Sequence, residues 1–258
     1  MTNLTRKIAV LRRGPFDSSH VLAWLRHAGH CAVDVCEWRD VRQIEVRDDG
    51  VCRAVLAGIP IQAFDAIMVV GTPGLYEKSS MQRRDVWYRN AERTAALLAA
   101  LSLVSGPRVL NPGLVFLWSR QLADPMVMLR RLAACGWRTP VTRHHLHIQD
   151  DGSGAFAQGE ECLTVHRIPD PPPESRHLIV FTPSGPPVIP DDLDIDMRRE
   201  VVLRTGATVA MMSNLALDWL TVAIGGSSTG TLAYGAMAEL PRSLPATIAS
   251  GIINASLQ

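Results

Sequence analysis

The chain has 258 residues, of which 47% are hydrophobic and 20% charged, a balance typical of soluble globular proteins. Its formal net charge of +1 provides no overall field that would attract nucleic acid or a membrane surface, so neither is expected as a partner. Five scattered Cys without a Cys-x-x-Cys pair, and no run of roughly 18 apolar residues, predict a cytoplasmic protein with reduced thiols.

The first part of the chain alternates predicted strands and helices. Short apolar runs typical of buried strands occur at residues 7–11, 32–36, 64–70 and 108–110. Helices are predicted at residues 17–28, 89–103 and 119–135, with a small hairpin at residues 51–61 that turns at Gly58. Because strands that alternate with helices form parallel sheets, residues 1–140 are expected to be a parallel α/β domain.

The pattern changes after Pro140. Strands are predicted at residues 141–148, 162–168, 219–224 and 231–236, and helices at residues 197–215 and 246–255. Two segments, residues 169–175 and 182–192, together hold eight prolines, too many for regular structure. Residues 141–258 are therefore expected to form a second, α+β domain.

The stretch RVLNPGLVFLWSRQLADPMVMLRRLAACGWRTPVT resembles the end of the N-terminal domain of ATP-grasp ligases, especially the RimK-like group. In that family a strand ending in Asn-Pro is followed by a helix, a Gly and a Pro-x-Thr. Asn111-Pro112, Gly136 and Pro140-x-Thr142 match this layout. The run with Trp87, Arg89 and Glu92 is similar to peptide-modifying members.

The C-terminal part carries the same resemblance. NLALDWLTVAI at residues 214–224 is similar to the family's leucine-aspartate-valine strand, and TLAYGAMAEL at residues 231–240 lies where the family has its metal-binding Glu-x-Asn strand. The tail LPATIASGIINASL resembles that of ligases that load amino acids onto an amino-group carrier protein. The resemblance implies a pre-ATP-grasp-like α/β domain over residues 1–140 and an ATP-grasp-like α+β domain over residues 141–258.

The sequence departs from this family at the residues that hold ATP. The family neutralises the triphosphate with two Lys of a central lobe and with Mg²⁺ held by acidic residues and an Asn. This chain has 24 Arg but only two Lys, the second at Lys78, and it has Gly235-Ala236-Met237 where Glu-x-Asn is expected. Only 56 residues separate Pro140 from Asp196, too few for the central lobe. We therefore expect a reduced second domain that binds neither ATP nor any other cofactor.

The densest polar cluster is Arg143-His144-His145-Leu146-His147. Alternation along a strand would place Arg143, His145 and His147 on one face, which suits an anion site, a general base or a solvated surface. No carboxylate or Cys stands at matching spacing, so no metal site is predicted there.

The candidate catalytic residues are His145, His147, Asp194 and Asp196. The candidate substrate-binding residues are cations that would hold an anionic group, although most are ordinary surface charges on the alternative interpretation: Arg83, Arg84, Arg89, Arg143, Arg167, Arg176, His177, Arg198 and Arg204.

Three functions follow as hypotheses. The first is an enzyme of natural-product (antibiotic) biosynthesis that acts without ATP on an anionic, amine-bearing amino-acid intermediate, held on a carrier protein or peptide, together with a second subunit. The chemistry would resemble the ring closure expected of the aziridine-forming protein pair of azinomycin-type pathways, in which an amine displaces an adjacent sulfate. This expectation rests on the likeness to carrier ligases and the missing ATP residues. The alternatives are a non-catalytic pseudo-ligase that recruits a peptide or carrier, and a divergent ATP-grasp carbon–nitrogen ligase.

Overall fold

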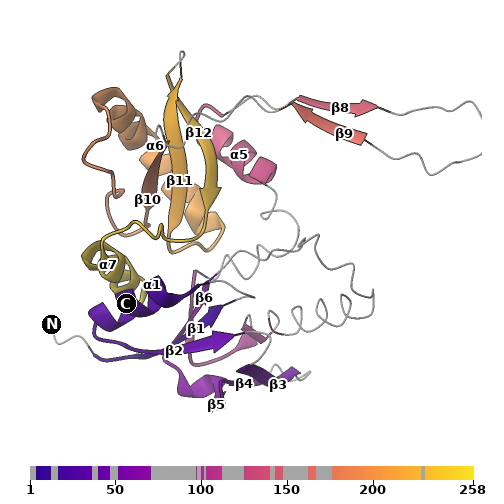
Figure 1. The fold of residues 1–258 in the computed structure, drawn as a ribbon, viewed down its shortest axis with the longest axis vertical. Coiled ribbons are helices and arrows are strands. Elements are labelled where there is room, and N and C mark those ends of the chain that lie inside the picture. The colour runs from indigo at the N-terminus through magenta and orange to yellow at the C-terminus, as the bar shows by residue number, and fades with distance from the viewer. Residues whose placement is uncertain are drawn as a thin grey trace, which may run out of the picture.

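The computed structural model describes residues 4–12, 17–36, 40–46, 52–70, 97, 100, 101, 103–111, 125–139, 143–147, 162–166, 176–227 and 230–258. These residues form two main sheets, one above the other in Figure 1, with helices packed against both. None of the helices in these ranges is long and apolar enough to cross a membrane.

The first sheet is parallel and has the strand order β2-β1-β6-β7. Its strands are β1 (Lys7–Arg12), β2 (Cys31–Cys36), β6 (Ala66–Val70) and β7 (Arg108–Leu110), and every adjacent pair is parallel. All five residues of β6 are buried, the near-continuous apolar run expected of a strand covered on both faces. The predicted parallel α/β fold of the N-terminal part is confirmed.

Two helices from opposite ends of the sequence lie together beside this sheet. α1 (Ser19–His27) packs against α7 (Ala246–Ser256), the last helix of the chain (Figure 1). The Ser250 hydroxyl donates to the Trp24 carbonyl at 2.8 Å, and His30 Nε2 lies 2.7 Å from the side-chain oxygen of Asn254. The C-terminal helix is thus fastened to the N-terminal region by hydrogen bonds as well as by apolar contacts.

A small antiparallel sheet lies in a segment for which only one hairpin was predicted. It contains β3 (Val41–Val46), β4 (Cys52–Leu56) and β5 (Ile59–Pro60), followed by the 3-10 turn η1 (Ile61–Ala63). The predicted hairpin corresponds to β4 and β5, whose turn uses Gly58 at φ +78°. The strand β3 was not predicted, because the polar VRQIEV lacks a continuous apolar run.

The second main sheet is antiparallel, with the order β10-β11-β12. Its strands are β10 (Arg176–Phe181), β11 (Leu220–Ser227) and β12 (Gly230–Met237), and its helices are α5 (Pro125–Ala134) and α6 (Ile195–Asn214). The predicted pair β11–β12 is confirmed, whereas β10 lies between the proline-rich segments and was not predicted. β10 was overlooked because its apolar run is short and the prolines around it indicated only loops.

The remaining described strands form a hairpin. β8 (Arg143–His147) and β9 (Cys162–His166) pair antiparallel, and in Figure 1 they lie apart from the other labelled elements. Between α5 and β10 these two strands are all the regular structure that the described residues contain. The predicted mixed α/β fold is confirmed.

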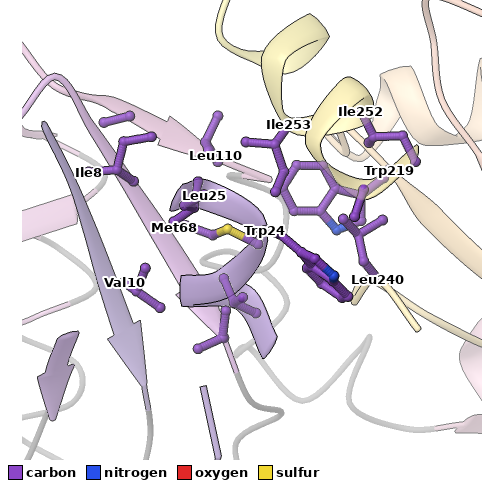
Figure 2. Close-up of a cluster of buried hydrophobic side chains, with 14 of the residues drawn as sticks. Ile8, Val10, Trp24, Leu25, Met68, Leu110, Trp219, Leu240, Ile252 and Ile253 are labelled. Carbon is purple, nitrogen blue, oxygen red and sulfur yellow. The ribbon is translucent and has the colours of Figure 1, made fainter. Parts of the chain in front are cut away.

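The two main sheets share one core, which we call the seam. Trp24 comes from α1, Leu110 from β7, Trp219 and Leu240 from the segments flanking β11 and β12, and Ile253 from α7 (Figure 2). These side chains are between 0% and 6% exposed. Burial of several large apolar side chains, each worth about 1.5–3 kcal/mol, makes the seam a main source of stability.

Asn111 adds a polar clamp to the seam. This residue is fully buried and adopts a positive φ of +53°. Its side-chain amide donates to the Ala238 carbonyl at 2.7 Å, and its side-chain oxygen accepts from the Asp218 backbone N–H at 2.8 Å. In return, the Asp218 carboxylate accepts from the Asn111 backbone N–H and from Arg108 at 3.3 Å. The Asn of the Asn-Pro motif therefore joins the end of the first sheet to the second.

Candidate functional site

The second sheet has one face covered by α5 and α6, and an opposite face that enters the seam at Val180. Ile179, Phe181, Val222 and Ile224 pack with residues of α5 and α6 in one apolar cluster. The register places alternate residues on the opposite face, which we call the distal face: Arg176, Leu178, Val180, Thr221, Ala223, Gly225, Leu232, Gly235 and Met237. The distal face thus consists almost entirely of apolar and small residues.

The three strands lack the side chains that bind Mg²⁺. Their sequences are RHLIVF, LTVAIGGS and GTLAYGAM, which contain no Asp, Glu, Asn, Gln or Lys. Mg²⁺ prefers an octahedral set of oxygen ligands that normally includes carboxylates. Thr, Ser and Tyr hydroxyls and backbone carbonyls are the only oxygens that these strands offer.

Arg176 is the only Arg or Lys in these strands. The carbon at the centre of its guanidinium lies 5.6 Å from the centroid of the Tyr234 ring, a cation–π arrangement that holds the charge over the sheet. His177, the next residue, belongs to the opposite face and its Nδ1 lies 3.8 Å from the Asp192 carboxylate. These two predicted substrate-binding residues therefore lie on different faces and have different neighbours.

A small pocket lies at the seam, beside the carboxyl end of β6. We call it the seam pocket, and it is partly open to solvent. Its walls are apolar except for two ionisable side chains, and they comprise His20, Val21, Trp24, Met68, Val69, Val70, Trp219, Ala238, Glu239 and Leu240. The carboxyl ends of parallel strands are the usual location of ligand sites in α/β sheets, and this pocket occupies that position.

The electrostatics of the seam pocket favour a neutral histidine. Burial lowers the pKa of His20, and the nearby Arg242 lowers it further, while Asp17 opposes them. The His20 ring packs edge-on against Trp24, with 4.9 Å between the ring centroids. Arg242 also lies 3.8 Å from the Asp17 carboxylate, and hydrogen bonds from Ser19 lower the pKa of that carboxyl. At neutral pH the pocket therefore presents an imidazole able to accept a proton beside the Glu239 carboxyl group.

The two predicted catalytic aspartates lie at the start of α6. Asp194 is the N-cap, and its side chain accepts a hydrogen bond of 2.8 Å from the Asp196 backbone N–H. Asp196 lies 3.5 Å from Arg199, and both of these side chains are more than three-quarters exposed. These contacts are those of a capped helix terminus on the surface.

Two further predicted cations lie on α6. Arg198 donates to the carbonyls of Pro190 and Asp191 at 3.0 and 3.3 Å. Arg204 donates to the Gly136 carbonyl at 2.6 Å and pairs with Glu200 at 2.8 Å. Both guanidinium groups hold neighbouring segments of the fold, and neither lines the seam pocket.

The other predicted site residues belong to the hairpin or fall outside the described residues. Arg143, His145 and His147 occupy alternate positions of β8, opposite His166, Thr164 and Cys162 of β9. The predicted substrate-binding residues that lie outside the described ranges are Arg83, Arg84, Arg89 and Arg167. The assignments of all these residues stay predictions.

Sequence reasoning missed His20, Glu239 and Arg242. His20 follows a predicted helix cap, and Glu239 follows the strand where the family has its metal ligands, so both had a local signal. Their proximity depends on the packing of α1 against the segment that follows β12, which no spacing in the sequence indicates.

Neither a search of known protein families nor one of curated proteins finds a match to this sequence. Comparison with solved structures does. The ATP-grasp ligase PsnB, in complex with the precursor peptide PsnA2 and AMPPNP, aligns with a TM-score of 0.60 and 13% identity over 100% of this chain and 99% of its own. The chain has the ATP-grasp fold.

Two further structures support this conclusion. The macrocyclase MdnC from Microcystis aeruginosa, bound with its precursor peptide MdnA, aligns with a TM-score of 0.59 and 11% identity over 96% of this chain and 99% of its own. An ATP-grasp RimK domain protein from Sphaerobacter thermophilus aligns with a TM-score of 0.56 and 18% identity over 97% of this chain and 99% of its own. The predicted resemblance to ATP-grasp ligases is confirmed at the level of the fold.

Proposed function

We propose that this protein is a biosynthetic enzyme on an ATP-grasp scaffold that acts on an amine-bearing intermediate without using ATP. The observation that carries the proposal is the composition of the second sheet, whose three strands contain neither Lys nor any carboxylate or amide side chain. A triphosphate brings several negative charges, and Arg176, the one Arg or Lys of these strands, would have to replace two Lys and a metal site. The ATP-grasp scaffold combined with these three strands supports a reaction that does not use ATP.

The seam pocket is the site that we propose for the chemistry. Its walls are mostly apolar, and His20 and Glu239 supply two groups able to take a proton from a substrate amine. Arg242, held near Asp17 at the same end of α1, supplies a cation for an anionic group.

The specific reaction that we propose is closure of an aziridine ring. The amine nitrogen would form a bond to the adjacent carbon while the carbon–oxygen bond to a sulfate group breaks. The sulfate leaves with the electron pair of that bond, and the proton of the amine passes to His20 or Glu239. This displacement balances without an oxidant, a nucleotide or a metal ion.

A peptide or a carrier protein is the proposed partner that presents the intermediate. Support comes from the structural neighbours MdnC and PsnB, which were solved with precursor peptides bound. A second protein subunit is also proposed. α6 exposes Ile195, Val202 and Leu203 by 65%, 62% and 68%, an apolar surface that such a subunit would cover.

The test uses the purified chain, freed of nucleotide with an ATP-hydrolysing enzyme. It is incubated with a peptide or carrier that bears an amine next to a sulfate ester, with and without co-purified proteins. Mass spectrometry is expected to show loss of the sulfate and ring closure, and His20→Gln together with Glu239→Gln is expected to abolish it. In parallel, calorimetry with Mg-ATP is expected to give no binding.

The alternatives give different results. A product that forms only with Mg-ATP, or tight Mg-ATP binding, would establish a divergent carbon–nitrogen ligase and overturn the proposal. Binding of the peptide or carrier without turnover under any of these conditions would establish a pseudo-ligase and overturn the enzymatic assignment.

A further inference from the structure

α6 packs against the second sheet with one side and leaves the other side exposed. Val201, Thr208 and Met212 are buried on the inner side of the helix. On the opposite side, which we call the outward side, Val202 is 62% exposed and Leu203 is 68% exposed. Large apolar side chains that are grouped at the surface indicate an interaction site.

The two halves of the outward side differ in the size of their side chains. The N-terminal half carries Val202 and Leu203, and the C-terminal half carries Gly206, Ala207 and Ala210, all of them exposed. A glycine in the middle of a helix is unfavourable, and a Cβ built at Gly206 meets no atom within 4 Å, so no described contact within the chain requires this glycine. The surface of α6 is therefore raised in one half and hollow in the other.

The charges of α6 are also confined to its N-terminal half. Asp196 and Arg199 form an ion pair of 3.5 Å, with both side chains more than three-quarters exposed. No residue of α6 after Arg204 is charged, and the last turn contains no basic residue. Because the C-terminus of a helix carries a partial negative charge, a cation from another molecule would be favourable there.

A second copy of the chain fits the difference in size. A two-fold axis makes contacts reciprocal, so that each of two residues in contact meets the other twice. When two copies of α6 pack antiparallel, with the axis at the level of residues 204–205, Leu203 lies opposite Gly206 of the second copy. Val202 likewise lies opposite Ala207 of the second copy. Each large side chain then fills a hollow.

The antiparallel arrangement also fits the charges. It places Arg199 opposite Ala210 of the second copy, close to the helix C-terminus that has no cation of its own. A parallel pair would instead bring the two Arg199 side chains together and the two Asp196 side chains together, and like charges that face each other are unfavourable. Charge and size therefore select the same orientation.

We propose that the outward side of α6 is a homodimer interface, in which two copies of this chain pack their α6 helices antiparallel. This identifies the second subunit of the proposed function as another copy of the chain, and it does not depend on the reaction proposed for the seam pocket. A single pair of helices, each about 30 Å long, is a small interface, so a reversible association in the micromolar range is expected. At nanomolar concentration the chain is a monomer, and its unfolding does not involve these contacts.

Sedimentation equilibrium of the full-length chain, at roughly 1 to 100 µM, measures the association and is expected to show monomer and dimer. Gly206→Leu is expected to weaken the dimer by at least about tenfold, because the new side chain occupies the hollow that Leu203 of the second copy fills. The same substitution improves the helix propensity of the chain, so the monomer is expected to remain folded in a thermal melt. Leu203→Glu is a second variant, which places a charge in the contact and is expected to abolish the dimer.

The matched control is Gly251→Leu. Gly251 is an exposed glycine of α7, and a Cβ built there also meets no atom within 4 Å. The control introduces the same side chain on another helix and is expected to leave the dissociation constant unchanged.

Disulfide formation between introduced cysteines tests the orientation. A mixture of Arg199→Cys and Ala210→Cys chains is expected to form a disulfide between positions 199 and 210, identified by peptide mass spectrometry with the wild type as the blank. In the antiparallel pair the two copies of position 199 lie about 16 Å apart along the helix axis, too far for a disulfide, which needs Cα atoms within about 7 Å. Arg199→Cys alone is therefore expected to form no 199–199 disulfide.

Four results would overturn the proposal. They are a chain that stays monomeric at about 100 µM, a dimer that Gly206→Leu and Leu203→Glu leave intact, an equal loss of association in Gly251→Leu, and a 199–199 disulfide. A monomeric chain that binds a different protein through Leu203 gives the first of these results. Sedimentation is measured without substrate, so its failure is distinguishable from a failure of the reaction proposed for the seam pocket.

Discussion

The seam and the distal face of the second sheet differ in the size of the side chains that they carry. The seam buries Trp24, Trp219 and Leu240 and satisfies its polar clamp at Asn111 with several hydrogen bonds. The distal face carries Ala223, Gly225 and Gly235 instead of larger or charged side chains. The comparison teaches that the joint between the sheets is filled by large side chains, and the distal face takes part in it only where Val180 packs into the seam.

The largest effect is expected at Trp219, which is 1% exposed and donates to the Ala238 carbonyl at 3.1 Å. Trp219→Ala would leave a cavity between the two sheets and lower the free energy of unfolding by about 3–5 kcal/mol. Urea denaturation measures this free energy of unfolding. Leu203→Ala, at a position that is 68% exposed, is the control and is expected to change it by less than about 0.5 kcal/mol. Equal losses would contradict the importance of the seam.

Asn111→Ala is expected to have the second-largest effect and to lower the free energy of unfolding by roughly 3 kcal/mol. The substitution removes the hydrogen bonds to Ala238 and Asp218, and it places a residue with a Cβ but no local polar group at φ +53°. The free energy of unfolding again measures the effect. Asn111→Gly relieves the backbone term alone and is expected to lose less. Equal losses of unfolding free energy in Asn111→Gly and Asn111→Ala would show that the positive φ of this residue does not affect stability.

Asp194→Ala tests whether a predicted catalytic residue acts as a helix cap. Loss of the hydrogen bond to the Asp196 N–H is expected to lower the free energy of unfolding by about 1 kcal/mol. Asp194→Asn keeps a capping oxygen and is expected to retain most of the stability. A loss of turnover in Asp194→Asn at unchanged stability would instead support the predicted catalytic role.

Gly235→Ala examines the distal face directly. A Cβ built at Gly235 meets no atom within 4 Å, so the substitution is expected to raise the free energy of unfolding by up to about 1 kcal/mol through the unfolded state. Gly136→Ala is the contrast, because Gly136 has φ +86° and the Cβ would lie 3.1 Å from Arg204 Nε. That variant is expected to be destabilised. A destabilised Gly235→Ala would show that the distal face is packed after all.

The smallest effect is expected from His20, as a change in pH dependence. Because burial lowers its pKa in the folded state, the unfolded state binds more protons near pH 6. Its contribution to stability is therefore present above the unfolded pKa of about 6.5 and is lost as the pH falls through the folded value. The difference in stability between the wild type and His20→Gln, followed from pH 7.5 to 5, is expected to change in favour of the variant. The nearby charges Asp17, Glu239 and Arg242 are present in both proteins, so a constant difference would refute this assignment.

The sequence by itself determined the strands and helices whose apolar residues repeat regularly. Buried runs such as residues 66–70 are apolar on both faces, and α7 follows a helical repeat, so local composition was sufficient there. The lack of carboxylate, amide and Lys side chains in β10, β11 and β12 likewise needs only the identity of the residues. The polar strand β3 and the short strand β10 were missed, because their structure comes from pairing with a neighbour more than from their own composition.

Only the tertiary structure decided what these elements bring together. The register of β8 with β9 places Cys162 opposite His147, and the packing of α1 against the segment after β12 brings His20 and Glu239 to one pocket. The same packing joins Asn111 to Ala238, 127 residues further along the chain. The physical reason is that burial and pairing act between surfaces, and a sequence specifies which surfaces exist without stating which residues will meet across them.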